Sequence, residues 1–144
     1  MVSINRGRVW LGGLVGGLVW VIWSLIVNIL ILGPRYAEAQ KAGQFLAQPR
    51  YGFFMVAWII ILLMLGTVVS MLYASVRTTC GAGPCTALFV GLVVGFAAGV
   101  PTNFGVATWS TFDRIFPLWW MLELWLGAVF AALAAGWLYR DARE

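Results

Sequence analysis

Four long apolar runs, separated by short polar segments, dominate the pattern of the chain. They cover approximately residues 9–32, 53–76, 86–107 and 115–139. Each run is as long as the roughly 20 apolar residues that an α-helix needs to cross the hydrocarbon core of a bilayer. The pattern predicts an all-α polytopic integral membrane protein with a single transmembrane domain over residues 1–144, built as a compact antiparallel bundle of four transmembrane helices.

The segment of residues 33–52 is the longest piece outside these runs. It opens with Gly33 and Pro34, which cannot continue the first helix. Its middle places Tyr36, Ala39 and Leu46 on one side of a helix. We therefore expect a short interfacial helix that lies on the membrane surface between the first two spans, with an ordinary polar loop as the alternative.

Small residues recur at helical spacing along each span and indicate where two helices approach closely. The residues to which we assign helix packing are Gly13, Gly17, Gly91, Gly95, Gly99, Gly127 and Ala131. A second stripe of small residues on the last span lies opposite Glu123, and we expect it to be free for a partner helix. Its members are Ala128, Ala132 and Gly136.

The composition fits a bilayer as the solvent and argues against several functions. Hydrophobic residues make up 62% of the chain and charged residues 10%, and the net charge of +4 comes from basic residues near the ends of the apolar runs. There they suit lipid head groups, so we expect no nucleic-acid partner. The chain has no histidine, the commonest transition-metal ligand and general base. We therefore expect no catalytic residues, metal, cofactor or enzymatic activity.

The distribution of basic residues predicts the orientation in the membrane. An even number of spans places both termini on one face, together with the turn of residues 80–85. That face carries five basic residues and the opposite face four, which favours cytoplasmic termini. The five are Arg6, Arg8, Arg77, Arg140 and Arg143, and the four are Arg35, Lys41, Arg50 and Arg114.

Glu123 is the only acidic side chain within the four apolar runs. At a rise of about 1.5 Å per residue it falls in the half of the membrane nearer to residues 33–52, as do several neutral polar residues. We predict that the first, third and fourth spans form a polar pocket there, with Glu123 at its base and a kink at Pro101 opening it. The neutral members of this pocket are Ser24, Asn28, Thr102 and Asn103.

Two states of Glu123 stay open, because an isolated carboxylate inside a bilayer is costly. A hydrated, titratable carboxyl group would carry a proton or bind a cationic solute. A neutral group hydrogen-bonded to Asn28 or Asn103 would instead hold helices together.

The cysteines and tryptophans suggest further chemistry. Cys80 and Cys85 lie in the turn after the second span, and the Gly-rich residues between them allow a disulfide, so a redox pair is one hypothesis and inert thiols are the other. The nine tryptophans could stack on a pigment or quinone. Those at span ends are typical of the aromatic belt of membrane proteins.

Several short pieces, read together, resemble an uncharacterised family of small bacterial integral membrane proteins with four predicted spans. The matching pieces are Asn28 with Leu32-Gly33-Pro34, Leu72-Tyr73-Ala74, Gly81-Ala82-Gly83-Pro84 with Thr86-Ala87, Glu123, and Gly136-Trp137-Leu138-Tyr139-Arg140. The resemblance implies a location in the bacterial inner membrane and supplies no activity.

Three classes of function follow from these patterns. The first is a structural or accessory subunit, or a self-associating membrane scaffold, and the lack of catalytic groups favours it. Its partners would be the lipid bilayer and either other membrane protein subunits or further copies of the chain. The first alternative is a small proton or solute conductor or transporter built around Glu123, and the second is a thiol redox protein using Cys80 and Cys85.

Overall fold

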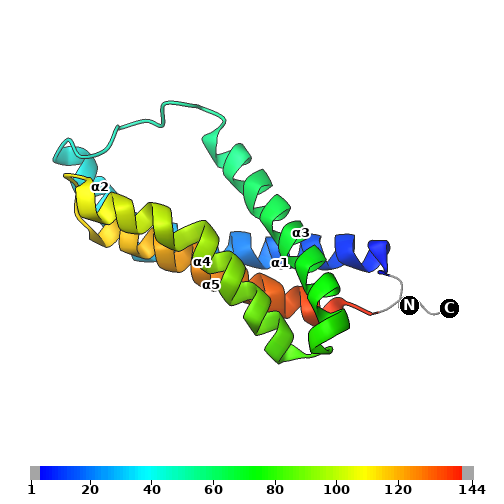
Figure 1. Cartoon of the computed structure of the whole chain (residues 1–144). Helices are drawn as coiled ribbons and strands as arrows, with labels where there is room; N and C mark the ends of the chain where they lie inside the picture. Colours follow the sequence, from blue (N-terminus) through cyan, green and yellow to red (C-terminus); the bar gives the residue numbers. More distant parts are fainter. Residues whose placement is uncertain (1–3, 141–144) are drawn as a thin grey trace.

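The computed structural model describes residues 4–140 and consists of membrane-length helices joined by short connections and one longer one (Figure 1). In chain order the elements are α1 (Arg6–Leu25), the π-helical η1 (Ile26–Ile31), α2 (Gly33–Lys41), α3 (Phe54–Cys80), α4 (Pro84–Trp109) and α5 (Ile115–Leu138). The predicted fold class is confirmed, with four antiparallel candidate spans and α2 as the short helix between the first two. Arg143, used above to predict orientation, lies outside the described residues.

The helix ends follow from local sequence. The side chain of Asn5 caps α1 by accepting a hydrogen bond from the backbone N of Arg8 at 3.1 Å. Pro34 and Pro84 stand in the first turns of α2 and α4, where a missing N–H costs nothing. Gly81 ends α3 with φ +86°, a conformation that glycine adopts without strain. These signals fix where the chain turns between spans.

Glycines bring α1 and α3 into backbone contact. A Cβ atom added at Gly66 of α3 would lie 2.5 Å from the Cα and N atoms of Gly17, and one added at Gly13 would lie 2.7 Å from the Cα of Thr67. Neither helix could approach so closely with larger residues at these positions. Gly13 and Gly17, assigned to helix packing, are thus buried at the α1–α3 contact.

A second glycine stripe brings α4 onto α5. Added Cβ atoms at Gly91, Gly95 and Gly99 would come within 2.6–2.9 Å of backbone atoms of α5. On the α5 side this contact buries Ala128 and Ala132 completely. The expectation that their stripe is free for a partner helix was therefore wrong, because α4 of the same chain covers it. The spacing of residues reveals a helix face made of small residues, but it does not reveal which helix covers that face.

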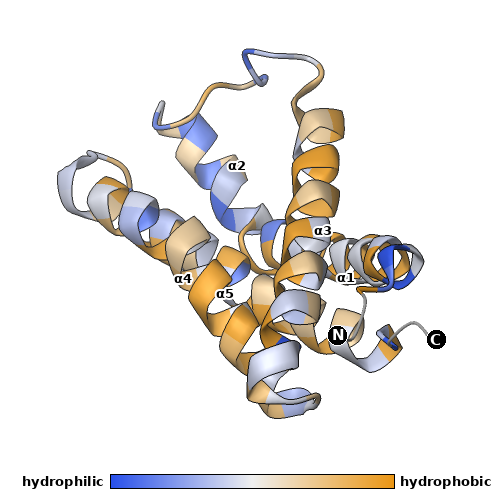
Figure 2. Cartoon of the chain, turned by 45° about the vertical axis from the view of Figure 1, so that its right-hand side comes forward, coloured by the Kyte–Doolittle hydropathy of each residue, from blue (hydrophilic) through white to orange (hydrophobic). Residues whose placement is uncertain are grey.

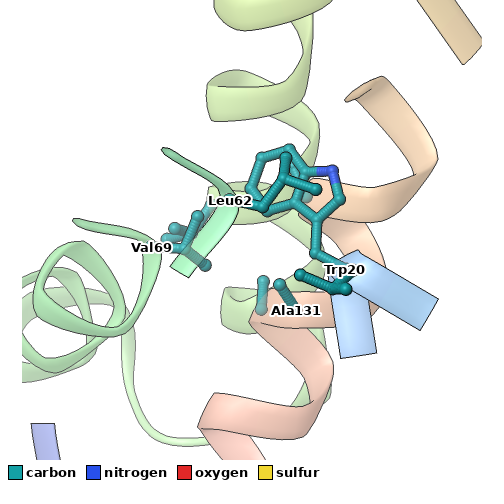
Figure 3. Packing of buried hydrophobic residues seen from close by; sticks show 8 residues of the cluster. Trp20, Leu62, Val69 and Ala131 are labelled. Carbon is teal, nitrogen blue, oxygen red and sulfur yellow. The ribbon is translucent and has the colours of Figure 1, made fainter. Parts of the chain in front are cut away.

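The third contact joins α1 to α5 around a large side chain. The indole ring of Trp20 packs directly on Gly127, and Ala131 meets Gly16 one turn further along. Trp20 and Ala131 are fully buried together with Leu62 and Val69 of α3. These four side chains belong to the largest apolar cluster (Figure 3). Gly127 and Ala131, also assigned to packing, lie at this three-helix junction.

The bundle is opened at one end by α3. Its N-terminal half leans away from α1 and α5, and residues 42–53 bridge the gap back to α2 (Figure 1). The spans are coloured mostly hydrophobic, and hydrophilic residues gather on α2 and the bridging segment (Figure 2). Large exposed apolar side chains such as Met64 and Phe89 cover the outer faces, as expected of a multi-pass protein surrounded by lipid.

Candidate functional site

The carboxyl group of Glu123 lies in a hydrogen-bond network between α1, η1 and α5. Its Oε1 atom accepts a hydrogen bond from the Ser24 hydroxyl, and its Oε2 atom accepts one from the side-chain amide of Asn28 at 2.9 Å. Glu123 is only 1% exposed. An ionised carboxylate offers about four acceptor positions, so these two donors would leave part of that capacity unused.

Asn28 owes its position to a local departure from α-helical geometry. The backbone N of Leu32 donates to the carbonyl of Val27, five residues earlier, at 2.9 Å, which is π-helical pairing. Such turns are frequent at functional sites. The Asn28 amide also donates to the carbonyl oxygen of Ser24 at 3.0 Å, so one side chain joins the end of α1 to Glu123.

The network continues from Asn28 to the short helix α2. The hydroxyl of Tyr36 donates to Asn28 Oδ1 at 2.9 Å and accepts from the indole N–H of Trp120 at 2.7 Å. Burial raises the pKa of Tyr36 above its ordinary value of 10.0. The phenol therefore stays protonated near neutral pH and keeps its donor role, which ties α2 to α5.

The second span also reaches the network. The indole N–H of Trp58 on α3 donates to the hydroxyl oxygen of Ser24 at 3.2 Å, while that hydroxyl donates to Glu123. Three spans and α2 thus contribute to one chain of hydrogen bonds around a single carboxyl group. Such a network fixes the orientation of each member through its neighbours.

A cavity of about 780 Å³ opens beside Glu123, where α3 leans away from the bundle. The end of α1, η1 and the N-terminal half of α3 flank it. Helix α2 and residues 42–53 cover its end. Eight of its lining residues are exposed: Leu25, Ile29, Phe54 and Met55 on the first two spans, and Gln40, Leu46, Gln48 and Pro49 on α2 and the segment after it. The opening therefore lies between the first two spans and extends to residues 40–49. The volume is typical of sites for small organic molecules.

The lining of this cavity is mostly apolar and aromatic. Phe54, Trp58 and Trp120 are among its aromatic residues. Of the described residues that line it, Glu123 and Tyr36 are titratable and none is Lys or Arg. The cavity therefore combines apolar walls with one buried acid.

The predicted pocket is placed only in part by the structure. Ser24, Asn28 and Glu123 come together as hydrogen-bond partners, and Asn103 lines the same cavity but donates to the Gly99 carbonyl of its own helix at 2.8 Å. Thr102 is exposed and lies outside the lining. Pro101, on α4, is exposed and outside the lining as well, so the cavity is opened by the lean of α3 and not by this proline.

Three aromatic residues of the site were missed from the sequence. The sequence places Tyr36 on the short helix between the first two spans and offers the tryptophans only as stacking or belt residues, so it assigns none of Trp58, Tyr36 and Trp120 to the pocket of Glu123. The available signal was depth, since Trp58 and Trp120 lie at the same level as Ser24 and Glu123. Other tryptophans do behave as belt residues, for example Trp109 and Trp137, which are largely exposed.

The two cysteines lie apart from this site. Cys80 ends α3 and Cys85 stands in the first turn of α4, and both are exposed free thiols. Within residues 4–140, no group of three His, Cys, Asp or Glu side chains could hold a metal ion.

The cysteine turn offers a direct test of orientation. A membrane-impermeant maleimide is expected to label Cys80 and Cys85 from the same side, because a three-residue turn separates their helices. Labelling only after permeabilisation of intact cells would agree with the predicted cytoplasmic termini. Single Cys80→Ser and Cys85→Ser variants report each thiol separately, and labelling of the two from opposite sides would contradict the antiparallel arrangement of α3 and α4.

Comparison of the chain with protein-family models, with curated proteins and with solved structures gives no match. The resemblance to small bacterial four-span proteins therefore stays a prediction, and the four apolar helices show a multi-pass membrane protein. Its function has to be inferred from the geometry around Glu123.

Proposed function

We propose that the chain is a membrane-embedded binding protein or carrier for a small, largely apolar molecule. The observation that supports this proposal is the carboxyl group of Glu123, which is 1% exposed yet lines a cavity of about 780 Å³. A residue that served only to join helices would need no such space beside it. The opening between η1 and α3 would admit the ligand sideways, from the bilayer.

The accessory-subunit or scaffold hypothesis has less support. It was based on the lack of catalytic groups and on a free stripe of small residues on α5, and α4 covers Ala128 and Ala132 of that stripe. The remaining outer faces carry large apolar side chains that suit lipid. We retain the bacterial inner membrane, with cytoplasmic termini and without enzymatic activity, as the proposed setting. The thiol redox alternative depends on Cys80 and Cys85, which lie outside the cavity.

The binding proposal can be tested with a small neutral aryl diazirine, a photoactivatable molecule that partitions into bilayers. In nanodiscs we expect saturable labelling of the peptides that contain Met55 and Trp58, displaced by an excess of the same compound without the diazirine. Mass spectrometry of the digested protein locates the labelled residues.

A matched pair of variants separates the cavity from the lipid-facing surface. Met55 and Met64 are both exposed on α3, but only Met55 lines the cavity. Met55→Trp should narrow the opening of the cavity and reduce the saturable component, whereas Met64→Trp should leave it unchanged. Labelling that rises linearly with probe concentration and is equal in both variants would refute the proposal.

A further inference from the structure

We infer that the ligand of this cavity is an organic cation, which binds at Glu123 in exchange for the carboxyl proton. The inference rests on the proposed function and specifies the chemical class of its ligand. It follows from the charge of the cavity, from the chemistry of its walls and from the proton balance at Glu123.

The first argument is that the negative charge of an ionised Glu123 has no counter-charge among the described residues that line the cavity. Its described hydrogen-bond donors, Ser24 and Asn28, are neutral. The described residues that line the cavity from α1, η1, α3 and α4 include no titratable or charged side chain, α2 contributes the phenol of Tyr36, and α5 contributes Glu123 itself. A charge in a medium of low dielectric constant requires a partner. A bound cation would supply it.

The second argument separates an organic cation from a metal ion. Calcium takes six to eight oxygen ligands and magnesium demands an octahedral set, whereas Glu123 is the single carboxylic acid among the described lining residues. The faces of indole and phenyl rings attract organic cations, and desolvation strengthens that attraction. Phe54 and Trp58, stacked with their ring centroids 6.1 Å apart, supply two such rings on α3.

The third argument is the proton balance. Two electrically neutral forms of the site are available, the protonated acid and the carboxylate with a bound cation. When an ammonium ion binds, the O–H bond of Glu123 breaks, the proton leaves to water, and the carboxylate accepts hydrogen bonds from the ammonium N–H groups. No oxidant or other reactant is needed. Cation binding should therefore release one proton, and it should strengthen as pH rises while the acid is protonated.

Three probes with the same apolar cage and different charge test the inference. They are the adamantan-1-yl ammonium ion, neutral 1-adamantanol and the adamantane-1-carboxylate ion. Binding to the full chain in nanodiscs is measured by titration calorimetry between pH 5 and pH 8, with empty nanodiscs subtracted. Repeating the titration in buffers of different ionisation enthalpy counts the protons released.

We expect the ammonium ion to bind at least tenfold more tightly than the alcohol, and the carboxylate ion to bind most weakly. While Glu123 is protonated, the Kd of the ammonium ion should fall about tenfold per pH unit, with one proton released per ion bound. Glu123→Gln should remove the preference for the ammonium ion over the alcohol. If this variant fails to fold, the number of protons released by the unmodified chain still tests whether the cation replaces the carboxyl proton.

Different results would overturn the cation inference and the proposed binding function. If the alcohol binds as tightly as the ammonium ion and no proton is released, the ligand is neutral and the inference is overturned while the cavity remains a binding site. If neither probe binds, or if both bind the Met55→Trp variant as tightly as they bind the unmodified chain, the proposed binding function is refuted.

Discussion

Replacing Gly66 with alanine is expected to push α1 and α3 apart and to lower the free energy of unfolding by about 1–3 kcal/mol. The added Cβ atom would lie 2.5 Å from the Cα and N atoms of Gly17 and 2.7 Å from the carbonyl oxygen of Gly13. These are backbone atoms, so no side-chain rotation relieves the overlap and the helices themselves must move. Unfolding by sodium dodecyl sulfate in mixed micelles, followed by circular dichroism, measures the change.

The matched control is the same substitution at Gly105 in α4. A Cβ atom there would meet nothing within 4 Å. Alanine also has the higher helix propensity, by about 1 kcal/mol, so Gly105→Ala should be neutral or slightly stabilising. Equal effects at Gly66 and Gly105 would mean that helix propensity, and not the close α1–α3 approach, controls stability.

The second large effect is expected at Asn28. Replacing it with leucine, which has a similar volume, removes the donor to Glu123 and the acceptor of the Tyr36 hydroxyl in one step. Both partners remain largely buried, so we expect the free energy of unfolding to fall by about 1–3 kcal/mol. The same change should weaken ligand binding, because nothing else described holds the Oε2 side of the carboxyl group in place. Detergent unfolding and the saturable photolabelling measure the two effects.

Asn103→Leu is the control for this prediction. Asn103 also lines the cavity, but its amide donates to Gly99 within α4 and so joins no helices. Its replacement should cost no more than about 0.6 kcal/mol, a typical value for one hydrogen bond inside a membrane. If both substitutions have the same effect, the Asn28 bridge contributes nothing beyond an ordinary local bond.

The four spans and their packing faces could be predicted from the sequence because each depends on local composition. Apolar length identifies the helices, and small residues at intervals of four mark positions where backbones approach, as at Gly91, Gly95 and Gly99. The depth of Glu123 and its proximity to Ser24 and Asn28 follow from the same helical arithmetic. These features need no knowledge of which helix neighbours which.

The remaining features depend on the order in which helices pack. The stripe of Ala128 and Ala132 has the same appearance whether α4 or another protein covers it. Trp58 joins the site because α3 leans away from the bundle and lines the resulting cavity, and Tyr36 joins because η1 sets the direction of α2. A single sequence carries no periodic signal for either arrangement. Asn103 and Thr102 are neighbours in sequence, yet Asn103 lines the cavity and Thr102 is exposed.

The π-helical segment η1 makes this part of the chain intolerant of changes in length. Its bond from Leu32 to Val27 spans five residues, so deleting one residue between Ile26 and Ile31 would restore α-helical pairing. The chain after η1, beginning with α2, would then be rotated by about 100° relative to α1, and Tyr36 would move away from Asn28. Substitutions keep the register, whereas insertions and deletions are compatible with the site only away from it, as in the turn of residues 81–83 between α3 and α4.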